Sequence, residues 1–292
     1  MILRSILLAA ALAVQSGDVT FVSNDGSKLS GTLTFPAQNA SVPVPAVLLI
    51  AGSGPVDRDE RIGPNAFFAD LAAALNTAGY AVLRYDKRGV GKSTTAVPRT
   101  SVVRRNFVDD AESALALLES DKRIDPKHIF IFGHSEGGEL AMAVGLEHSE
   151  VRGLILAAPL PTGYATLIER QIDREHIDPY AASQLRLAEQ MSFVKSYASI
   201  DPVKEVTHVT QPLLILHGNR DINVLDSDLQ PFLDAAKKSD RNAMIHEFPN
   251  DEHFFFRMNP ADTVDNAFYF NAIHHPDADM LQVVMDWLKA QK

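Results

Sequence analysis

The chain has 292 residues, of which 46% are hydrophobic and 22% are charged, a composition typical of a globular protein that fills a sizeable core. Its 27 basic and 37 acidic residues give a formal net charge of -10, which argues against nucleic acid or an anionic membrane as a partner. Cysteine is absent, which excludes disulfides and a lipid-anchored cysteine. The length suits one large domain or two small ones, and a small or neutral substrate fits the charge best.

The first residues have the pattern of a secretory signal peptide. Arg4 is a positive flank, residues 6–14 form an apolar run, and Ala11-Leu12-Ala13 or Val14-Gln15-Ser16 offers small residues for cleavage. The run is too short to span a bilayer core of about 30 Å, so stable membrane insertion is not expected. We expect residues 1–16 to be a cleaved signal peptide and the mature protein to be periplasmic or extracellular; a buried N-terminal strand is the alternative.

An antiparallel hairpin is predicted next. Residues 19–23 and 29–35 alternate, or nearly alternate, between apolar and polar side chains around Asn24-Asp25-Gly26, a turn that tolerates positive φ. Residues 46–50 then form a continuous apolar run, as expected for a strand that is buried on both faces. The pattern therefore changes here from an antiparallel edge to a buried sheet.

Expected strands and helices alternate along the rest of the chain. Apolar spacing predicts helices near 67–79, 107–118, 137–146 and 280–288, and apolar runs predict strands at 80–85, 128–132, 153–158, 212–216 and 243–248. This alternation indicates an α/β fold with a mostly parallel sheet and helices on both of its faces. We expect residues 18–292 to form this domain.

Residues 161–210 interrupt the alternation. No strand is predicted in this segment, whereas Leu187, Met191 and Val194 have helical spacing among many charged residues. Ligands of open α/β sheets bind at the carboxyl ends of the strands. We expect a helical cap insertion that covers those ends and shapes the substrate pocket.

The motif Gly133-His134-Ser135-Glu136-Gly137 lies between a predicted strand and a predicted helix. A serine in this G-x-S-x-G arrangement lies on a sharp turn that presents its hydroxyl above the sheet, and side chains at the flanking glycines would collide with neighbouring backbone. The motif alone also fits an ordinary strand-to-helix turn. If it is a nucleophile elbow, Ser135 is the nucleophile.

A serine nucleophile needs a base and a group that orients the base. Asp221 follows the strand predicted at 212–216, and His253 follows the strand predicted at 243–248, so both are expected at the same sheet edge as Ser135. The order Ser, Asp, His suits this topology. His134 is the competing base, although a packed structural role suits it better, and Asp226 and Asp251 are alternative acids.

Acyl transfer also needs backbone N–H groups that stabilise an oxyanion, one from the residue after the serine and one from the loop after the third strand. Glu136 supplies the first. Gly52-Ser53-Gly54 follows the buried strand at 46–50, and we expect the N–H of Ser53 to be the second. The alternative is a glycine loop without a catalytic role.

These motifs, together with Gly52-Ser53-Gly54-Pro55-Val56-Asp57-Arg58-Asp59 and Asp86-Lys87-Arg88-Gly89-Val90-Gly91-Lys92-Ser93, resemble an α/β-hydrolase. More narrowly, they are similar to the bacterial serine carboxylesterases and serine aminopeptidase-like hydrolases. The resemblance runs from about residue 18 to the C-terminus and implies a Ser-His-Asp acyl-enzyme mechanism without a cofactor. The charged sequel to the oxyanion loop points to the esterase branch. Ala51 is a departure, since many members have histidine there.

Two other functions stay open. An aminopeptidase or acyl-peptide hydrolase would use the same triad, and a ligand-binding protein without catalysis could share the fold.

Gly91-Lys92-Ser93 resembles the end of a phosphate-binding loop but lacks the first glycine of that motif, because Asp86 stands at its position. A nucleotide site is therefore not expected.

Several further groups have ordinary structural interpretations. His274, His275 and Asp277 lack metal-ligand spacing. We expect residues 57–61 to form an ion-paired loop that holds the oxyanion turn, and residues 254–256 and 268–270 to pack in the core or lid.

Overall fold

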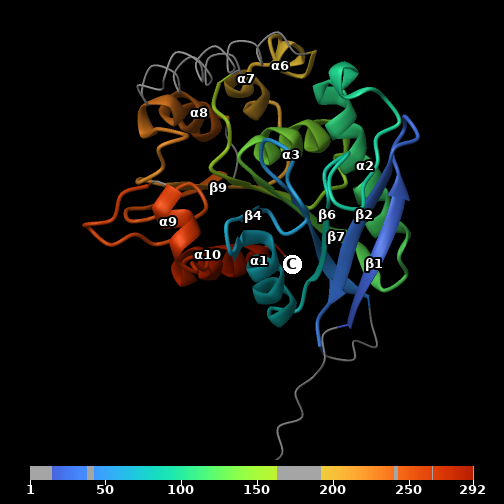
Figure 1. Ribbon diagram of the computed structural model, residues 1–292, viewed down its shortest axis with the longest axis horizontal. Coiled ribbons are helices and arrows are strands. Elements are labelled where there is room, and N and C mark those ends of the chain that lie inside the picture. Colours follow the sequence, from blue (N-terminus) through green and yellow to red (C-terminus); the bar gives the residue numbers. More distant parts are fainter. Residues whose placement is uncertain (1–14, 38–42, 163–191, 240–242, 265, 292) are drawn as a thin grey trace, which may run out of the picture.

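The computed structural model describes residues 15–37, 43–162, 192–239, 243–264 and 266–291. Within these ranges a sheet of eight strands has the order β1-β2-β6-β3-β7-β8-β9-β10, and β4 and β5 form a separate two-stranded sheet (Figure 1). The strands are β1 (Gln15–Val22), β2 (Lys28–Phe35), β3 (Val44–Ile50), β4 (Arg61–Ile62), β5 (Asn65–Ala66), β6 (Ala81–Tyr85), β7 (Ile124–His134), β8 (Gly153–Ala157), β9 (Leu213–Gly218) and β10 (Ala243–Phe248).

The strand directions confirm the predicted mixed sheet. β1 pairs with β2, and β2 with β6, in antiparallel fashion. The six strands from β6 to β10 in the sheet order, namely β6, β3, β7, β8, β9 and β10, are parallel to one another. The predicted hairpin is therefore the antiparallel edge. β1 begins at Gln15, so it includes the last two residues of the predicted leader; residues 1–14 lie outside the described part of the chain.

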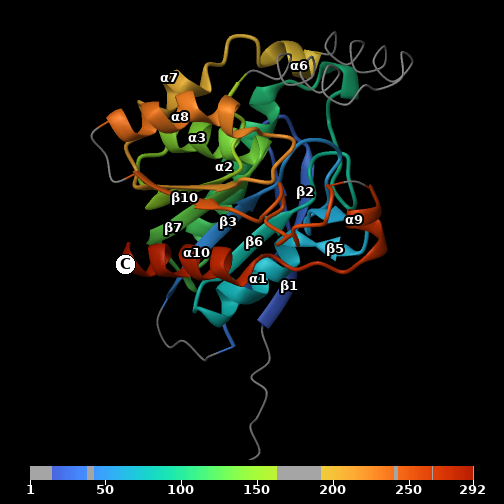
Figure 2. The same cartoon turned by 90° about the vertical axis from the view of Figure 1, so that its left-hand side faces the viewer.

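Helices cover both faces of the sheet (Figure 2). α1 (Phe67–Thr77) and α10 (Ala278–Ala290) pack on one face, and α2 (Arg104–Ser120), α3 (Glu136–Glu147) and α8 (Asp226–Lys238) pack on the other. Successive side chains of a strand point to opposite faces. In β3, Leu48 and Ile50 accordingly join the core under α2, α3 and α8, while Val47 and Leu49 join the core under α1 and α10.

Helix α8 is not among the helices predicted from the sequence. Its buried residues Leu229, Phe232, Leu233 and Ala236 have the spacing of one helix face, but Pro231 and the acidic first turn obscured the pattern. Shorter helical segments are η1 (Arg99–Ser101), α6 (Ser192–Ser196), α7 (Pro202–Val206) and α9 (Asn266–Asn271). α6 and α7 fall within the predicted cap of residues 161–210, of which residues 163–191 lie outside the described residues.

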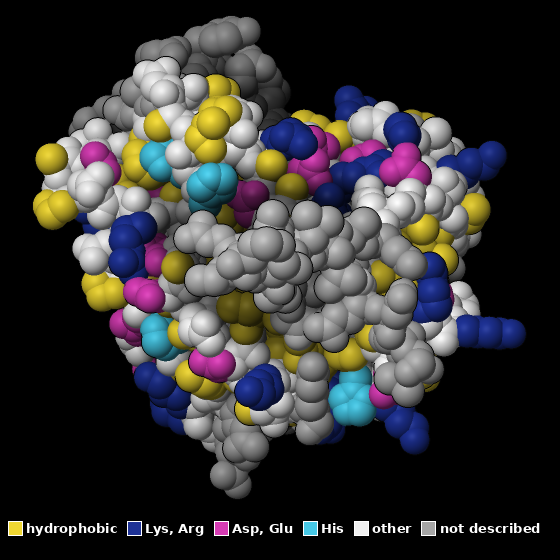
Figure 3. Space-filling view, turned by 90° about the horizontal axis from the view of Figure 1, so that it is seen from below, with side chains coloured by type: hydrophobic (Ala, Val, Ile, Leu, Met, Phe, Trp, Pro, Cys, Tyr) yellow, Lys and Arg dark blue, Asp and Glu magenta, His cyan; other side chains and the backbone are white. Residues whose placement is uncertain are grey.

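The surface seen from below carries mixed charge (Figure 3). Among the described residues on this face, lysine and arginine side chains lie interspersed with aspartate and glutamate. No helix within the described ranges is long and apolar enough to cross a bilayer.

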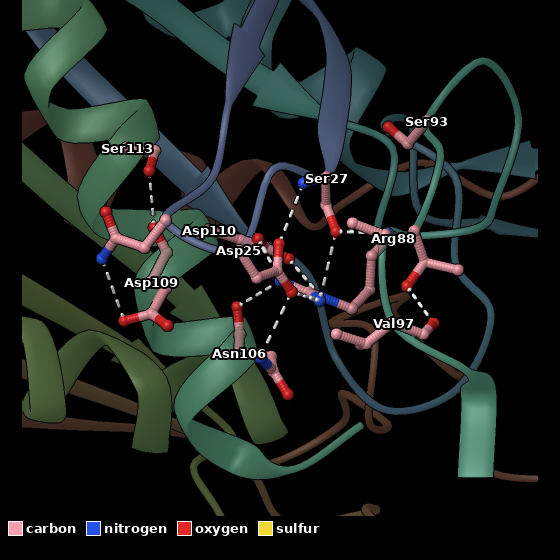
Figure 4. Close-up of polar contacts among 12 residues, drawn as sticks. Asp25, Ser27, Arg88, Ser93, Val97, Asn106, Asp109, Asp110 and Ser113 are labelled. Carbon is pink, nitrogen blue, oxygen red and sulfur yellow. Dashed lines mark hydrogen bonds and ion pairs between the residues drawn. The ribbon is translucent and has the colours of Figure 1, made fainter. Parts of the chain in front are cut away.

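A buried arginine joins the N-terminal hairpin to α2 (Figure 4). The guanidinium of Arg88 donates hydrogen bonds to both carboxylate oxygens of Asp110, at 2.8 and 2.6 Å, and to Asp25 at 2.7 Å. Burial opposes ionisation of Asp25, but its bond to Arg88 lowers its pKa to about 2. These contacts anchor the loop that follows β6.

Candidate active site

Ser135 lies on a strained turn between β7 and α3. Its φ of 54° is uncommon for a residue other than glycine. A Cβ on Gly133 would lie 2.0 Å from the carbonyl oxygen of Gly137, and a Cβ on Gly137 would lie 2.0 Å from that of Ile50. Glycine is therefore required on both sides of the serine, for the reason expected from the sequence.

The structure brings Asp221 and His253 together. Oδ2 of Asp221 lies 2.6 Å from Nδ1 of His253. Oδ1 of Asp221 accepts hydrogen bonds from the backbone N–H groups of Asn223 and Val224, at 2.7 and 2.9 Å. Both members of the pair are buried, so the carboxylate fixes the histidine ring while its own position is held by backbone.

The pKa values of this pair shift in opposite directions. Burial opposes the charged form of each group, but the charge of and hydrogen bond from His253 lower the pKa of Asp221 below its usual value. For His253 the signs are reversed: burial lowers its pKa, whereas the charge of and hydrogen bond to Asp221 raise it. The effect of Asp221 is the larger, so the pKa of His253 is raised above its usual value. An imidazolium at this position is therefore stabilised by the carboxylate.

The loop that carries His253 is held by its neighbour Glu252, which the sequence analysis did not single out. Oε1 of Glu252 accepts from the backbone N–H groups of Phe254 and Phe256, at 2.9 and 3.0 Å, and Oε2 accepts from the hydroxyl of Tyr269. An acid that is adjacent to the candidate base in a loop was the only sequence signal for this role. Phe255 and Phe256 are fully buried, as expected of core residues.

The end of β9 packs directly against the same loop. The N–H of Arg220 donates to the carbonyl of Asp251 at 2.9 Å, and a Cβ on Gly218 would lie 2.4 Å from that oxygen. Glycine at the end of β9 therefore allows the loops of Asp221 and His253 to approach each other.

His134 has the structural role that the sequence favoured. Its Nδ1 lies 2.8 Å from Oε1 of Glu60, and its Nε2 lies 2.9 Å from the carbonyl oxygen of His253. The rings of His134 and His253 are 4.8 Å apart between centroids. Both nitrogens of His134 are thus occupied, and the residue next to Ser135 is tied to the backbone of His253.

Neither of the two alternative acids is hydrogen-bonded to His253 within the described residues. Oδ1 of Asp226 lies 2.6 Å from Nε2 of His217. The carboxyl group of Asp251 is buried and has no hydrogen-bond partner within the described residues. Burial, followed by the nearby Asp277 carboxylate, raises the pKa of Asp251 to about 8.

The segments that carry the two expected oxyanion donors meet at Ser135. Glu136 is the first residue of α3, and the N–H groups of a first helical turn have no acceptor within the helix. The loop of Gly52 and Ser53 lies against the serine, since a Cβ on Gly52 would be 3.2 Å from the Cβ of Ser135. Both N–H groups therefore belong to segments that meet at the serine.

The charged loop at residues 57–61 is ion-paired, as expected. Asp59 pairs with Arg84 at 2.8 Å, and Arg58 pairs with Asp86 at 2.8 Å. Oε1 of Glu60 accepts from the N–H of Gly52 at 2.7 Å. The loop thereby holds the turn on which Ser53 lies.

Lys87 belongs to the candidate site, although the sequence alone did not predict a role for it there. Its ammonium donates to the carbonyl oxygen of Gly52 and to Oε2 of Glu136, both at 2.8 Å. The available signal was a lysine two residues after the strand predicted at 80–85, which places it at the carboxyl edge of the sheet.

The histidines near the C-terminus have separate partners. Nε2 of His274 lies 2.8 Å from the carbonyl oxygen of Phe268, and Nδ1 of His275 lies 2.7 Å from Asp70. Within the described part of the chain, no group of three or more histidine, aspartate or glutamate side chains could hold a metal ion.

Comparisons with known proteins agree with this architecture. The family described as serine aminopeptidase, S33, matches residues 65–174. Esterase EstD of Thermotoga maritima is 30% identical over 227 residues, which are 70% of this chain and 53% of that protein. The chain thus spans about half the length of that esterase. An uncharacterized Escherichia coli K12 protein, YfhR, is 25% identical over 241 residues, which are 80% of this chain and 72% of that protein.

A solved structure shows the fold over almost the whole chain. The Pyrococcus furiosus esterase Pf2001 superposes with a TM-score of 0.72 and 19% identity, covering 96% of this chain and 92% of that one. At this identity the likeness establishes the α/β-hydrolase fold and leaves the chemistry to the side chains.

Proposed function

We propose that the chain, which has the α/β-hydrolase fold, is a serine hydrolase that cleaves carboxylic esters. The observation that carries the proposal is the 2.6 Å contact between Asp221 and His253. The neighbour of Ser135, His134, is bonded to the backbone of His253, and two indispensable glycines hold Ser135 on a strained turn. Similarity to an esterase supports the same reaction class. The substrate is a small ester, and no cofactor takes part.

The proposed reaction begins with attack of the Ser135 hydroxyl on the ester carbonyl carbon. His253 accepts the hydroxyl proton as the new C–O bond forms, and Asp221 stabilises the resulting imidazolium. The imidazolium then returns the proton to the leaving alcohol, which departs as the acyl-enzyme forms. Water attacks the acyl-enzyme with His253 again as base, and this releases the carboxylic acid and restores Ser135.

The N–H groups of Ser53 and Glu136 stabilise the oxyanion in this proposal. Each acts on charge that develops only in the transition state, so removal of one such donor typically costs about 2.7–4 kcal/mol of transition-state stabilisation. The loop bonds of Gly52 and the helix-start position of Glu136 support the assignment.

Peptide cleavage is the second candidate, because the family match is described as serine aminopeptidase. Parallel assays of p-nitrophenyl acyl esters of several chain lengths and of aminoacyl and acyl-peptide nitroanilides distinguish the two. We expect turnover of the esters, lost in Ser135→Ala. Exclusive cleavage of the anilides would replace the esterase proposal by a peptidase.

A labelling experiment tests the alternative that the protein binds a ligand without catalysis. A fluorophosphonate probe should label folded wild-type protein at Ser135 and leave Ser135→Ala unlabelled. Absence of both labelling and turnover in the folded protein would support the binding role.

Export is a separate proposal. It is supported by the leader pattern of residues 1–16, and the mature protein is then periplasmic or extracellular. Fractionation of cells that express the full chain, followed by N-terminal sequencing of the mature protein, tests it; an intact Met1 on cytoplasmic protein would contradict it.

A further inference from the structure

We infer that Lys87 is a positioning residue that holds both oxyanion donors in register. The inference rests on the proposed function and adds to it a residue outside the triad. Lys87 lies in the loop after β6, and its ammonium bridges the segments on the two sides of Ser135: the Gly52 carbonyl and the Glu136 carboxylate.

The first arm of the bridge orients the N–H of Ser53. The carbonyl of Gly52 and the N–H of Ser53 belong to one planar peptide unit, in which the two groups of a trans bond point in opposite directions. The structure has no cis peptide bond in its described residues. A hydrogen bond of 2.8 Å from Lys87 to the carbonyl therefore directs the N–H away from Lys87.

This segment needs such a restraint because it is rich in glycine. Gly52 and Gly54 flank Ser53, and Gly54 has a φ of 89°; glycine backbone adopts many conformations at little cost. The N–H of Gly52 is held by Glu60 at 2.7 Å, and its carbonyl is held by Lys87. With both polar groups of Gly52 fixed, the next peptide cannot rotate freely.

The second arm acts on Glu136, whose backbone N–H is the other proposed donor. Oε2 of its carboxylate lies 2.8 Å from the Lys87 ammonium, and Oε1 accepts from the hydroxyl of Tyr197 at 2.5 Å. The Glu136 side chain is fully buried. One ammonium thus links the residue before the first donor to the side chain of the second.

The surroundings of Lys87 keep the ammonium in place. Its Nζ lies 4.7 Å from the centroid of the Phe107 ring, a distance suited to a cation–π contact. The adjacent Arg88 anchors the loop through Asp110 and Asp25, independently of the Gly52 carbonyl. The loop can therefore keep its course when only the Lys87 side chain is changed.

The test compares Lys87→Met with Lys92→Met. Lys92 lies in the same loop but is exposed and pairs with Asp18. We expect Lys87→Met to lower kcat about ten- to hundredfold, the scale of a misplaced catalytic group, with little change in KM. A trifluoromethyl ketone forms an oxyanion with Ser135, so its binding should weaken in parallel and its inhibition constant should rise. Lys92→Met should match the wild type in all three.

Loss of Lys87 leaves the Glu136 carboxylate without its cation. The double variant Lys87→Met/Glu136→Gln removes that unpaired charge and serves as the second variant of the test. Lys87→Arg, which keeps the charge, serves as the rescue variant. Thermal melting of each reports folding. If Lys87 acts by orienting Gly52, the double variant keeps the low kcat and the weak ketone binding, and Lys87→Arg recovers part of both.

Two results would overturn the inference: wild-type kcat in folded Lys87→Met, or full recovery of kcat in the double variant, which would reduce Lys87 to a counter-ion. A double variant that does not fold, with Lys87→Arg folded and no better than Lys87→Met, also counts against it. Failure of the proposed function gives a different result, since the wild type would then show no turnover and no fluorophosphonate labelling of Ser135.

Discussion

Oδ2 of Asp221 lies 2.6 Å from Nδ1 of His253, although the two residues are 32 positions apart in the chain. Their loops follow β9 and β10, which are parallel neighbours in the sheet. The carboxyl ends of these strands therefore bring the two side chains to one edge. The other oxygen of Asp221 is bound to backbone N–H groups, so the acid cannot turn away from the histidine.

Replacement of Asp221 by asparagine should lower kcat by about four orders of magnitude, because an amide that faces Nδ1 favours the wrong histidine tautomer. Ester turnover under saturating substrate measures the effect. Asp226→Asn is the matched control, since Asp226 contacts His217 instead and should retain activity. Equal losses in the two variants would argue against Asp221 as the orienting acid.

The acid limb of the pH–rate profile should report His253. The base must be neutral to accept the proton of Ser135, and Asp221 raises the pKa of His253 above the ordinary histidine value of about 6.5. The plot of kcat/KM against pH should therefore fall on the acid side with a midpoint above that value. Asp221→Asn should move the midpoint of its residual activity to lower pH; an unchanged midpoint would exclude His253 as the titrating group.

Gly137→Ala tests the packing behind the nucleophile elbow. The added Cβ would lie 2.0 Å from the carbonyl oxygen of Ile50, so either α3 or β3 must shift. We expect a loss of at least about 1–3 kcal/mol in the free energy of unfolding, the usual scale of overpacking, together with reduced kcat. Gly17→Ala is the control, since its Cβ would meet nothing within 4 Å. Urea unfolding curves of both variants give the comparison.

Asp251→Asn should stabilise the protein, and increasingly so as the pH rises. Burial and Asp277 raise the pKa of Asp251 from 3.8 to about 8, so the folded state binds a proton that the unfolded state has lost. The wild type therefore loses stability as the pH rises between these two values, and asparagine has no proton to lose. At pH 8 and above we expect a gain of about 1–3 kcal/mol.

Thermal melting of Asp251→Asn at pH 5 and pH 8 measures this dependence, with the exposed Asp286→Asn as control. A gain in melting temperature that does not grow with pH would show that Asp251 is already ionised in the fold.

Much of the fold was predictable because its signals are local. Alternating apolar residues and the turn Asn24-Asp25-Gly26 indicated the hairpin, and continuous apolar runs indicated the buried strands. Helix α8 was missed because Pro231 lies inside its periodic pattern. β7 begins at Ile124, four residues before the predicted start, because Ile124 pairs with Val44 across an irregular register. That pairing depends on a distant strand and leaves no trace in the local sequence.

The sequence by itself determined the order of the elements, the glycines around Ser135 and the positions of acids and histidines after strand ends. These follow from side-chain periodicity and from the steric demands of one tight turn, which neighbouring residues set. Only the tertiary structure decided which of Asp221, Asp226 and Asp251 contacts His253, and that Lys87 bridges Gly52 and Glu136. Those contacts depend on the direction of side chains between loops far apart in the chain, and packing of the whole sheet fixes that direction.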